Sequence, residues 1–104
     1  MKVQFNTDKT ISGDHRSAAY FDEFISEGLK KHSEHITRVE AHLSDENGSK
    51  EGPKDIRCLL EARVEGKQPI AVKAQAATVE MAVSNAIDKL NASLDSVLGR
   101  LKSH

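Results

Sequence analysis

The sequence contains little of several residue types, and each shortage excludes a class of structure or function. Cys58 is the one cysteine among 104 residues, so no internal disulfide can form, which fits a reducing compartment. Tryptophan is absent and aromatic residues make up only 4% of the chain. Stacking of nucleic-acid bases on exposed rings is therefore not an obvious mode of binding.

The sequence also lacks a long apolar run and a strong charge of one sign. No apolar stretch approaches the ~18 residues of a membrane-spanning helix, and no leader of basic and then apolar residues opens the chain. We therefore expect a cytoplasmic protein that has no membrane association. Lysine and arginine number 15 and acidic residues 16, for a net charge of -1. A dedicated nucleic-acid binder has a clear basic excess, so such a role would depend on uneven placement of charge.

Four stretches alternate apolar and polar residues with a period of two, which is the pattern of strands that bury one face. They cover residues 2–7, 36–44, 56–65 and 70–76. Short polar turns separate the last three, and such turns predict a meander of antiparallel strands.

Two other stretches have helical spacing of their apolar residues. The first helix is expected from Asp14 to about His32, with Ser12 or Asp14 capping its start. The second is expected to follow a cap at Thr78 and to run to about Leu101 with one continuous apolar stripe. A strand, a helix and a strand usually form a crossover with parallel strands. The sequence thus predicts one α+β domain over residues 1–104, a β-α-β-β-β-α two-layer sandwich in which a four-stranded mixed sheet carries both helices on one face.

Candidate catalytic and metal sites are weak. His32 and His35 lack both the HExxH spacing and a third ligand, which favours solvated histidines at a helix end. Cys58 is expected to point into the core, where a thiol is inert because the thiolate is the reactive form. Residues 45–48 resemble the start of a calcium loop, but the spacing of further ligands is missing, so an exposed acidic turn is favoured. We expect no enzyme, no cofactor, no metal ion and no small-molecule substrate.

The sheet face that the helices leave open is the remaining candidate. It is expected to carry five basic residues, three acidic residues and a histidine: Lys2, Arg38, Arg57, Arg63 and Lys73, with Glu40, Glu61, Glu65 and His42. Cross-strand charge pairing would explain these residues without any ligand. Arginine forks and lysines on a rigid sheet also suit phosphate oxygens. Both interpretations remain open on composition alone.

Eight motifs keep a common order and spacing along the chain: VQFNT at 3–7, KHSEHITRVEAHLSDEN at 31–47, DIRC at 55–58, EAR at 61–63, GKQPIAV at 66–72, AAT at 76–78, AIDKL at 86–90 and LGRL at 98–101. Together they resemble the ribosome hibernation promoting factor family, which includes the ribosome-associated inhibitor A proteins. The resemblance implies the same fold and binding to ribosomal RNA in the small subunit, where messenger and transfer RNA would pass. It also implies inhibition of translation by occupancy, without a cofactor.

The resemblance further implies a short form of the family, without the C-terminal domain that dimerises ribosomes in long members. We expect it to be monomeric off the ribosome. An alternative is a diverged protein-binding module of the same fold that does not engage ribosomes.

Individual basic residues match basic positions of the family. With Lys73 of the open face, the expected contacts to ribosomal RNA are Arg38, Arg57, Arg63, Lys89, Arg100 and Lys102. His32 stands where many members carry an aromatic residue, and His35 where they carry arginine. Protonation of these two histidines in acid would restore charge, so we expect them to make pH-dependent contacts that strengthen at low pH.

Overall fold

Strands and helices follow one another in the predicted β-α-β-β-β-α order. The computed structural model describes residues 1–11, 16–47 and 55–102, with side chains described as far as residue 99. The elements are β1 (Lys2–Thr7), α1 (Ala18–Gly28), a 3₁₀ helix η1 (Lys30–His35), β2 (Ile36–Asp45), β3 (Ile56–Val64), β4 (Ile70–Ala76) and α2 (Val79–Lys102). The predicted fold class is confirmed, and η1 is an addition to it.

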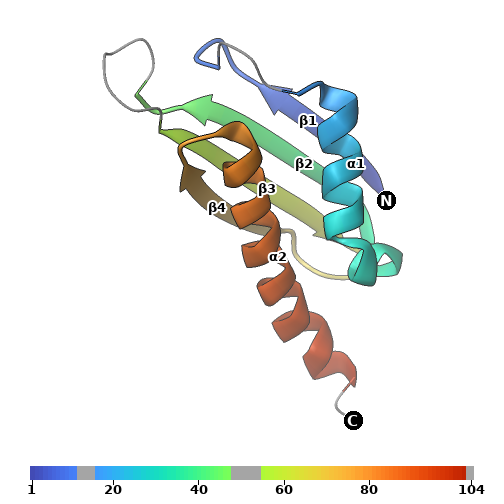
Figure 1. Ribbon diagram of the computed structural model, residues 1–104. Coiled ribbons are helices and arrows are strands. Elements are labelled where there is room, and N and C mark those ends of the chain that lie inside the picture. The colour runs from blue at the N-terminus through green and yellow to red at the C-terminus, as the bar shows by residue number, and fades with distance from the viewer. Residues whose placement is uncertain (12–15, 48–54, 103–104) are drawn as a thin grey trace.

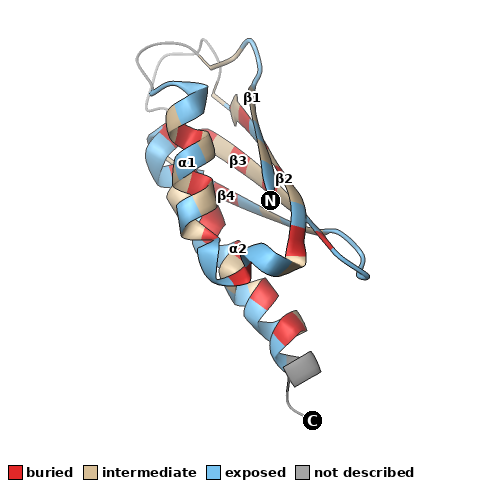
Figure 2. Cartoon of the chain, turned by 90° about the vertical axis from the view of Figure 1, so that its right-hand side faces the viewer, coloured by how far each residue is buried: buried red, intermediate tan, exposed pale blue. Residues whose placement is uncertain are grey.

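The sheet has the strand order β1-β2-β3-β4. β1 and β2 are parallel, with Val3 opposite Val39. The two later pairs are antiparallel, with Leu60 of β3 between Ala41 of β2 and Val72 of β4. α1 packs over β1, and α2 packs over β3 and β4. Both helices therefore lie on the same face of the mixed sheet, as predicted (Figure 1 and Figure 2).

The core lies between this face and the helices. Strand residues of one parity are buried in β2 and β3 and mostly half-buried in β1 and β4, and they meet a buried stripe from each helix. The largest fully buried side chains are Phe21, Ile25, Leu29, Val39, Leu43, Cys58, Leu60, Val83, Leu90 and Leu94. Full burial of a large apolar side chain contributes about 1.5–3 kcal/mol. This layer is therefore the main source of stability, and the residues of the opposite parity are left to the open face.

α1 begins later than the sequence predicts. Its first residue is Ala18, and the Ser17 hydroxyl accepts a hydrogen bond from the backbone N–H of Tyr20 at 3.2 Å. Ser17 is thus the N-cap, because its side chain satisfies one of the free donors of the first turn. The predicted start at Asp14 is wrong, and the predicted caps Ser12 and Asp14 lie outside the described residues.

α1 also ends earlier than predicted, at Gly28 instead of about His32. A Cβ atom on Gly28 would lie 2.8 Å from Cγ2 of Ile87 on α2, so only glycine allows this approach of the two helices. Asn91 of α2 donates its side-chain N–H to the Gly28 carbonyl at 2.8 Å. The end of α1 is therefore fixed by a contact with α2, and the chain continues as η1.

α2 begins where the sequence predicts. The Thr78 hydroxyl accepts a hydrogen bond from the backbone N–H of Met81 at 3.1 Å. The helix has 24 residues, which corresponds to a length of about 36 Å, and its C-terminal part extends beyond the sheet (Figure 1). Across the described part of the chain, no helix combines the length and apolar character needed to span a membrane.

The contact between Gly28 and Ile87 predicts opposite effects for two glycine substitutions. Alanine usually stabilises a helix by about 0.5–1 kcal/mol relative to glycine. Gly28→Ala should instead lower the free energy of unfolding by about 1–2 kcal/mol, because the buried, β-branched Ile87 side chain must move. The matched control is Gly99→Ala, where nothing lies within 4 Å of the added Cβ. Urea unfolding of both variants tests this, and equal stabilisation of both would contradict it.

Candidate functional site

The strand register brings three basic side chains of the open face together. Lys2 lies opposite Arg38, and Arg38 lies opposite Arg63, so these residues of β1, β2 and β3 form one row, here called the cation row. Arg38 forms an ion pair with Glu40 at 3.3 Å and donates a hydrogen bond to Gln4. The side chain of Arg63 is exposed and has no such partner among the described residues. Like charges opposite one another destabilise a sheet, so the row is favourable for an anion.

A second basic group lies near the other end of β3, here called the cation cluster: Arg57, Lys73 and Lys89. These residues line a hollow of about 290 Å³. Lys89 reaches it from α2, and its ammonium group donates to the Lys73 carbonyl at 2.8 Å. Arg57 forms an ion pair with Glu46 at 3.1 Å. Arg57 and Arg63 are six positions apart on β3, a distance of about 20 Å at ~3.3 Å per residue.

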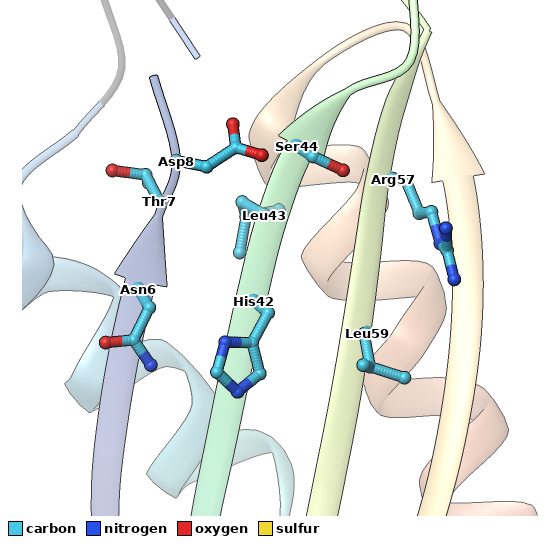
Figure 3. Close-up of a pocket in the computed structure, with 8 residues that line it drawn as sticks. All are labelled: Asn6, Thr7, Asp8, His42, Leu43, Ser44, Arg57 and Leu59. Carbon is cyan, nitrogen blue, oxygen red and sulfur yellow. The ribbon is translucent and has the colours of Figure 1, made fainter. Parts of the chain in front are cut away.

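A further hollow of about 320 Å³ lies on the open face beside the cation cluster, here called the central hollow. Its lining residues are Asn6, Thr7, Asp8, His42, Leu43, Ser44, Arg57 and Leu59. Asn6, His42 and Leu59 lie side by side on β1, β2 and β3, with the helices behind the sheet (Figure 3). Arg57 lines both hollows.

Sequence reasoning missed the central hollow. The imidazole of His42 is half exposed, so an exposed ring is present although aromatic residues are few. The available signal was Leu59, an apolar residue at a position of β3 where the alternation predicts a polar one. The hollow itself depends on side chains from three strands, which only the register brings together.

The helix layer has the opposite charge. Within α1 and the first part of α2, as far as residue 99, six acidic residues accompany one basic residue, Lys89: Asp22, Glu23, Glu27, Glu80, Asp88 and Asp95. On the strands, the open face carries five basic residues and two acidic ones, because β3 ends at Val64 and Glu65 belongs to the following turn. The open strand face is therefore net basic, and α1 with the first part of α2 is net acidic. Four further basic residues belong to the segments that follow: Lys30 and Lys31 of η1, and Arg100 and Lys102 at the end of α2.

His32 is not solvated, contrary to the expectation. Its side chain is buried, and its Nε2 lies 2.8 Å from Oδ1 of Asp95 on α2. Lys31 also pairs with this carboxylate at 2.9 Å. A contact of His32 with RNA stays a prediction that would require the ring to leave Asp95. His35 is partly exposed, and its Nε2 lies 3.7 Å from Glu34, so it remains the more accessible of the two.

Asp45 and Cys58 are both buried. Asp45 is buried instead of lying in an exposed turn, and its carboxylate accepts from the backbone N–H groups of Asn47 at 2.9 Å and Asp55 at 3.4 Å. It thus joins the two ends of the hairpin, of which residues 48–54 lie outside the described part. Cys58 is buried as predicted, and burial raises the pKa of its thiol to about 12. The described positions contain no group of three histidine, cysteine or acidic residues that could hold a metal ion.

The predicted lysine and arginine residues of the site thus divide into three sets. Arg57, Lys73 and Lys89 come together in the cation cluster. Arg38 and Arg63 come together in the cation row, with Lys2. The side chains of Arg100 and Lys102 lie outside the described part.

Comparisons with known proteins agree with this architecture. A family model described as "Sigma 54 modulation protein / S30EA ribosomal protein" matches residues 10–102. A ribosomal subunit interface protein from Coxiella burnetii is similar in structure, with a TM-score of 0.69 and 15% identity, over 95% of this chain and 99% of that one. The N-terminal domain of Thermus thermophilus Protein Y has a TM-score of 0.69 and 13% identity, over 93% and 99%. Comparison with curated proteins gives no match. At such low identities the two structures support the fold.

The environment of Asp95 predicts a pH-dependent contribution to stability. Hydrogen bonds from Lys31 and then His32 lower the pKa of this carboxyl group. A carboxyl group with a lowered pKa in the folded state stabilises the protein above its unfolded pKa of about 3.9, and the effect is lost as the pH falls through the folded value. Asp95→Asn should therefore reduce stability at about pH 7, and its difference from the wild type should shrink towards about pH 3.

Urea unfolding across this pH range measures the effect. Asp88→Asn is the matched control, because Asp88 is exposed on the same helix and has no hydrogen-bond or ion-pair partner among the described residues. This control should follow the wild type at every pH. A deficit of Asp95→Asn that stays constant into acid would contradict the assignment.

Proposed function

The chain belongs to the Sigma 54 modulation protein / S30EA ribosomal protein family, and from this premise we propose that it is a ribosome-binding translation inhibitor. Its partner is the ribosomal RNA of the small subunit, at the interface between subunits. The bound protein blocks the access of messenger and transfer RNA and preserves idle ribosomes under stress. It acts in the cytoplasm by occupancy, without catalysis or a cofactor, and it is monomeric off the ribosome.

The observation that carries this proposal is the pair of basic groups on one rigid face. Arg63 of the cation row and Arg57 of the cation cluster are about 20 Å apart along β3, on the sheet face that carries no helix (Figure 2), and Lys89 reaches the cluster from α2. Arginine forks bind phosphate oxygens with two parallel hydrogen bonds. Two such groups at a fixed distance suit an RNA surface whose phosphates have a matching separation.

The charge separation between the two layers supports a defined orientation. A net charge of -1 gives no general attraction to a polyanion. The acidic residues of α1 and of the first part of α2 are repelled by phosphate, whereas the open face is attracted, so the protein approaches RNA with its sheet. Binding then depends on the fit of one face, which distinguishes this protein from a general RNA-coating protein.

Reversal of one charge in each basic group tests the proposal. Arg63→Glu and, separately, Arg57→Glu should each weaken binding to small subunits by about tenfold or more, because a phosphate contact becomes a repulsion. Each should also reduce the slope of log affinity against log salt by about one unit. The measurement is co-sedimentation with small subunits and whole ribosomes over a salt series.

The control carries the same change in net charge on the helix layer. Ala19→Glu combined with Met81→Glu places two added acids at exposed positions of α1 and α2, more than one turn from Lys89. This double variant should bind nearly as well as the wild type. Equal losses in all three variants would contradict binding through the sheet face. Undiminished binding after both arginine reversals would favour the protein-binding module instead.

The ion pair between Arg57 and Glu46 predicts a variant that binds more tightly. A phosphate must compete with the Glu46 carboxylate for the guanidinium group, since the two side chains are 3.1 Å apart. An exposed ion pair is worth about 0.2–1 kcal/mol. Glu46→Gln should therefore increase affinity for small subunits by up to about fivefold. Glu23→Gln makes the same change in net charge on α1 and should have a smaller effect. Tighter binding by both to the same extent would show a general charge effect and contradict the local competition.

A further inference from the structure

We propose that the central hollow and the cation cluster together form a site for one unstacked nucleotide of RNA. The base would lie in the central hollow, on His42 and Leu59, and its phosphate would lie on Arg57, Lys73 and Lys89. The biological source of this nucleotide rests on the proposed function.

The floor of the central hollow suits the flat face of a base. His42 and Leu59 are direct partners in the β2–β3 register, so their Cβ atoms lie about 4.5–5.5 Å apart. They present an imidazole ring beside an aliphatic side chain, with Asn6 on the far side of the ring (Figure 3). Unstacked bases pack on histidine and other flat side chains in RNA-binding proteins. An apolar floor with a polar rim is also typical of a small-ligand site.

The rim of the hollow offers hydrogen bonds to the edge of a base. The Ser44 hydroxyl lines the hollow and has no hydrogen-bond partner among the described residues. The Asp8 carboxylate lies at the margin (Figure 3), and hydrogen bonds from the Thr10 hydroxyl and backbone N–H lower its pKa, so it stays ionised. A carboxylate repels phosphate but accepts from the amino group of a base. Asp8 offsets the charge of Arg57 on this lining, so the hollow has no net positive charge for a phosphate but does offer an acceptor to a base.

The neighbouring hollow has the opposite preference. Arg57, Lys73 and Lys89 surround it, and Glu46 is its one acidic lining residue. The side chain of Lys73 is exposed and has no ion-pair partner among the residues described. Arg57 lines both hollows, so the two form a continuous surface that crosses from β3 to β4. Adjacent strands are about 4.8 Å apart, which is comparable to the separation of base and phosphate within one nucleotide.

The geometry selects an unpaired nucleotide. In a duplex each base is covered on both faces by its neighbours, and only its edges are accessible in the grooves. A floor made by His42 and Leu59 can contact a base face only when the nucleotide is single-stranded or extruded from the stack. The ligand class is therefore an RNA loop, bulge or strand end, and a continuous duplex is excluded from this site.

Nuclear magnetic resonance of the full chain tests the two halves separately. Adenosine 5′-monophosphate should shift the signals of both the Leu59 methyl groups and the Lys73 amide. Leu59 and Lys73 are direct partners in the β3–β4 register, so residues further apart must separate the two halves. Adenosine should shift the side-chain amide of Asn6 and leave that of Gln75 unchanged, and ribose 5-phosphate at matched ionic strength should do the reverse. Leu59 signals that stay unchanged in adenosine 5′-monophosphate would overturn the proposal.

A matched pair of variants extends the test to RNA. Leu59→Gln should weaken binding of single-stranded oligoadenylate by about fivefold, since loss of a base contact costs roughly that much. Ala71→Gln, an exposed position of the same face that lines neither hollow, should bind like the wild type. A short RNA duplex should bind both variants equally. Equal affinity of Leu59→Gln and the wild type for oligoadenylate would overturn the base site.

Ribosome binding and nucleotide binding can be tested independently of each other. If the chain sediments with ribosomes but Leu59 responds to no nucleotide, the nucleotide site is wrong and the ribosome-binding proposal stands. If nucleotides shift Leu59 and Lys73 as expected but ribosomes are not bound, the nucleotide site stands and the ribosomal function is wrong.

Discussion

The two helices can share one face of the sheet because the end of α1 lies directly against α2. Gly28 leaves the space that Ile87 fills, and Asn91 satisfies the Gly28 carbonyl. One turn further, Asp95 holds His32 of η1. These contacts close the helix layer over the apolar side of the sheet. The opposite side then carries no helix, and its side chains are not required for the core.

This division explains why an unfavourable charge arrangement is tolerated on the open face. Strand side chains alternate, so residues such as Val39 and Leu60 supply burial while their neighbours face outward. Lys2, Arg38 and Arg63 can then lie in adjacent strands although like charges in such positions lower stability. The core provides the stability, and the open face can be organised for a ligand. Local features that cost stability are typical of functional surfaces.

The fold could be predicted from sequence because alternation of apolar and polar residues and a helix cap are both local patterns. Alternation located every strand, and the Thr78 cap located the start of α2. The start of α1 could not be predicted, because several polar residues before Ala18 could serve as a cap and local pattern does not rank them. His32 was missed because its partner Asp95 lies 63 residues away. The basic residues of the site were recognised from sequence, whereas the central hollow depends on the register of three strands and left only Leu59 as a signal.

Each basic group of the open face contains its own acidic neighbour. Glu40 pairs with Arg38 at 3.3 Å, and Glu46 pairs with Arg57 at 3.1 Å. A polyanion with arbitrary spacing gains little, since it must displace these carboxylates without engaging both groups. A ligand whose phosphates fit both groups gains a phosphate–arginine contact at each of them, which offsets the loss of each ion pair. Competition from these carboxylates lowers the affinity for every RNA. It lowers affinity most for an RNA whose phosphates do not fit both groups, and repulsive elements create specificity in this way. The net negative charge of the chain is therefore compatible with selective binding to a polyanion.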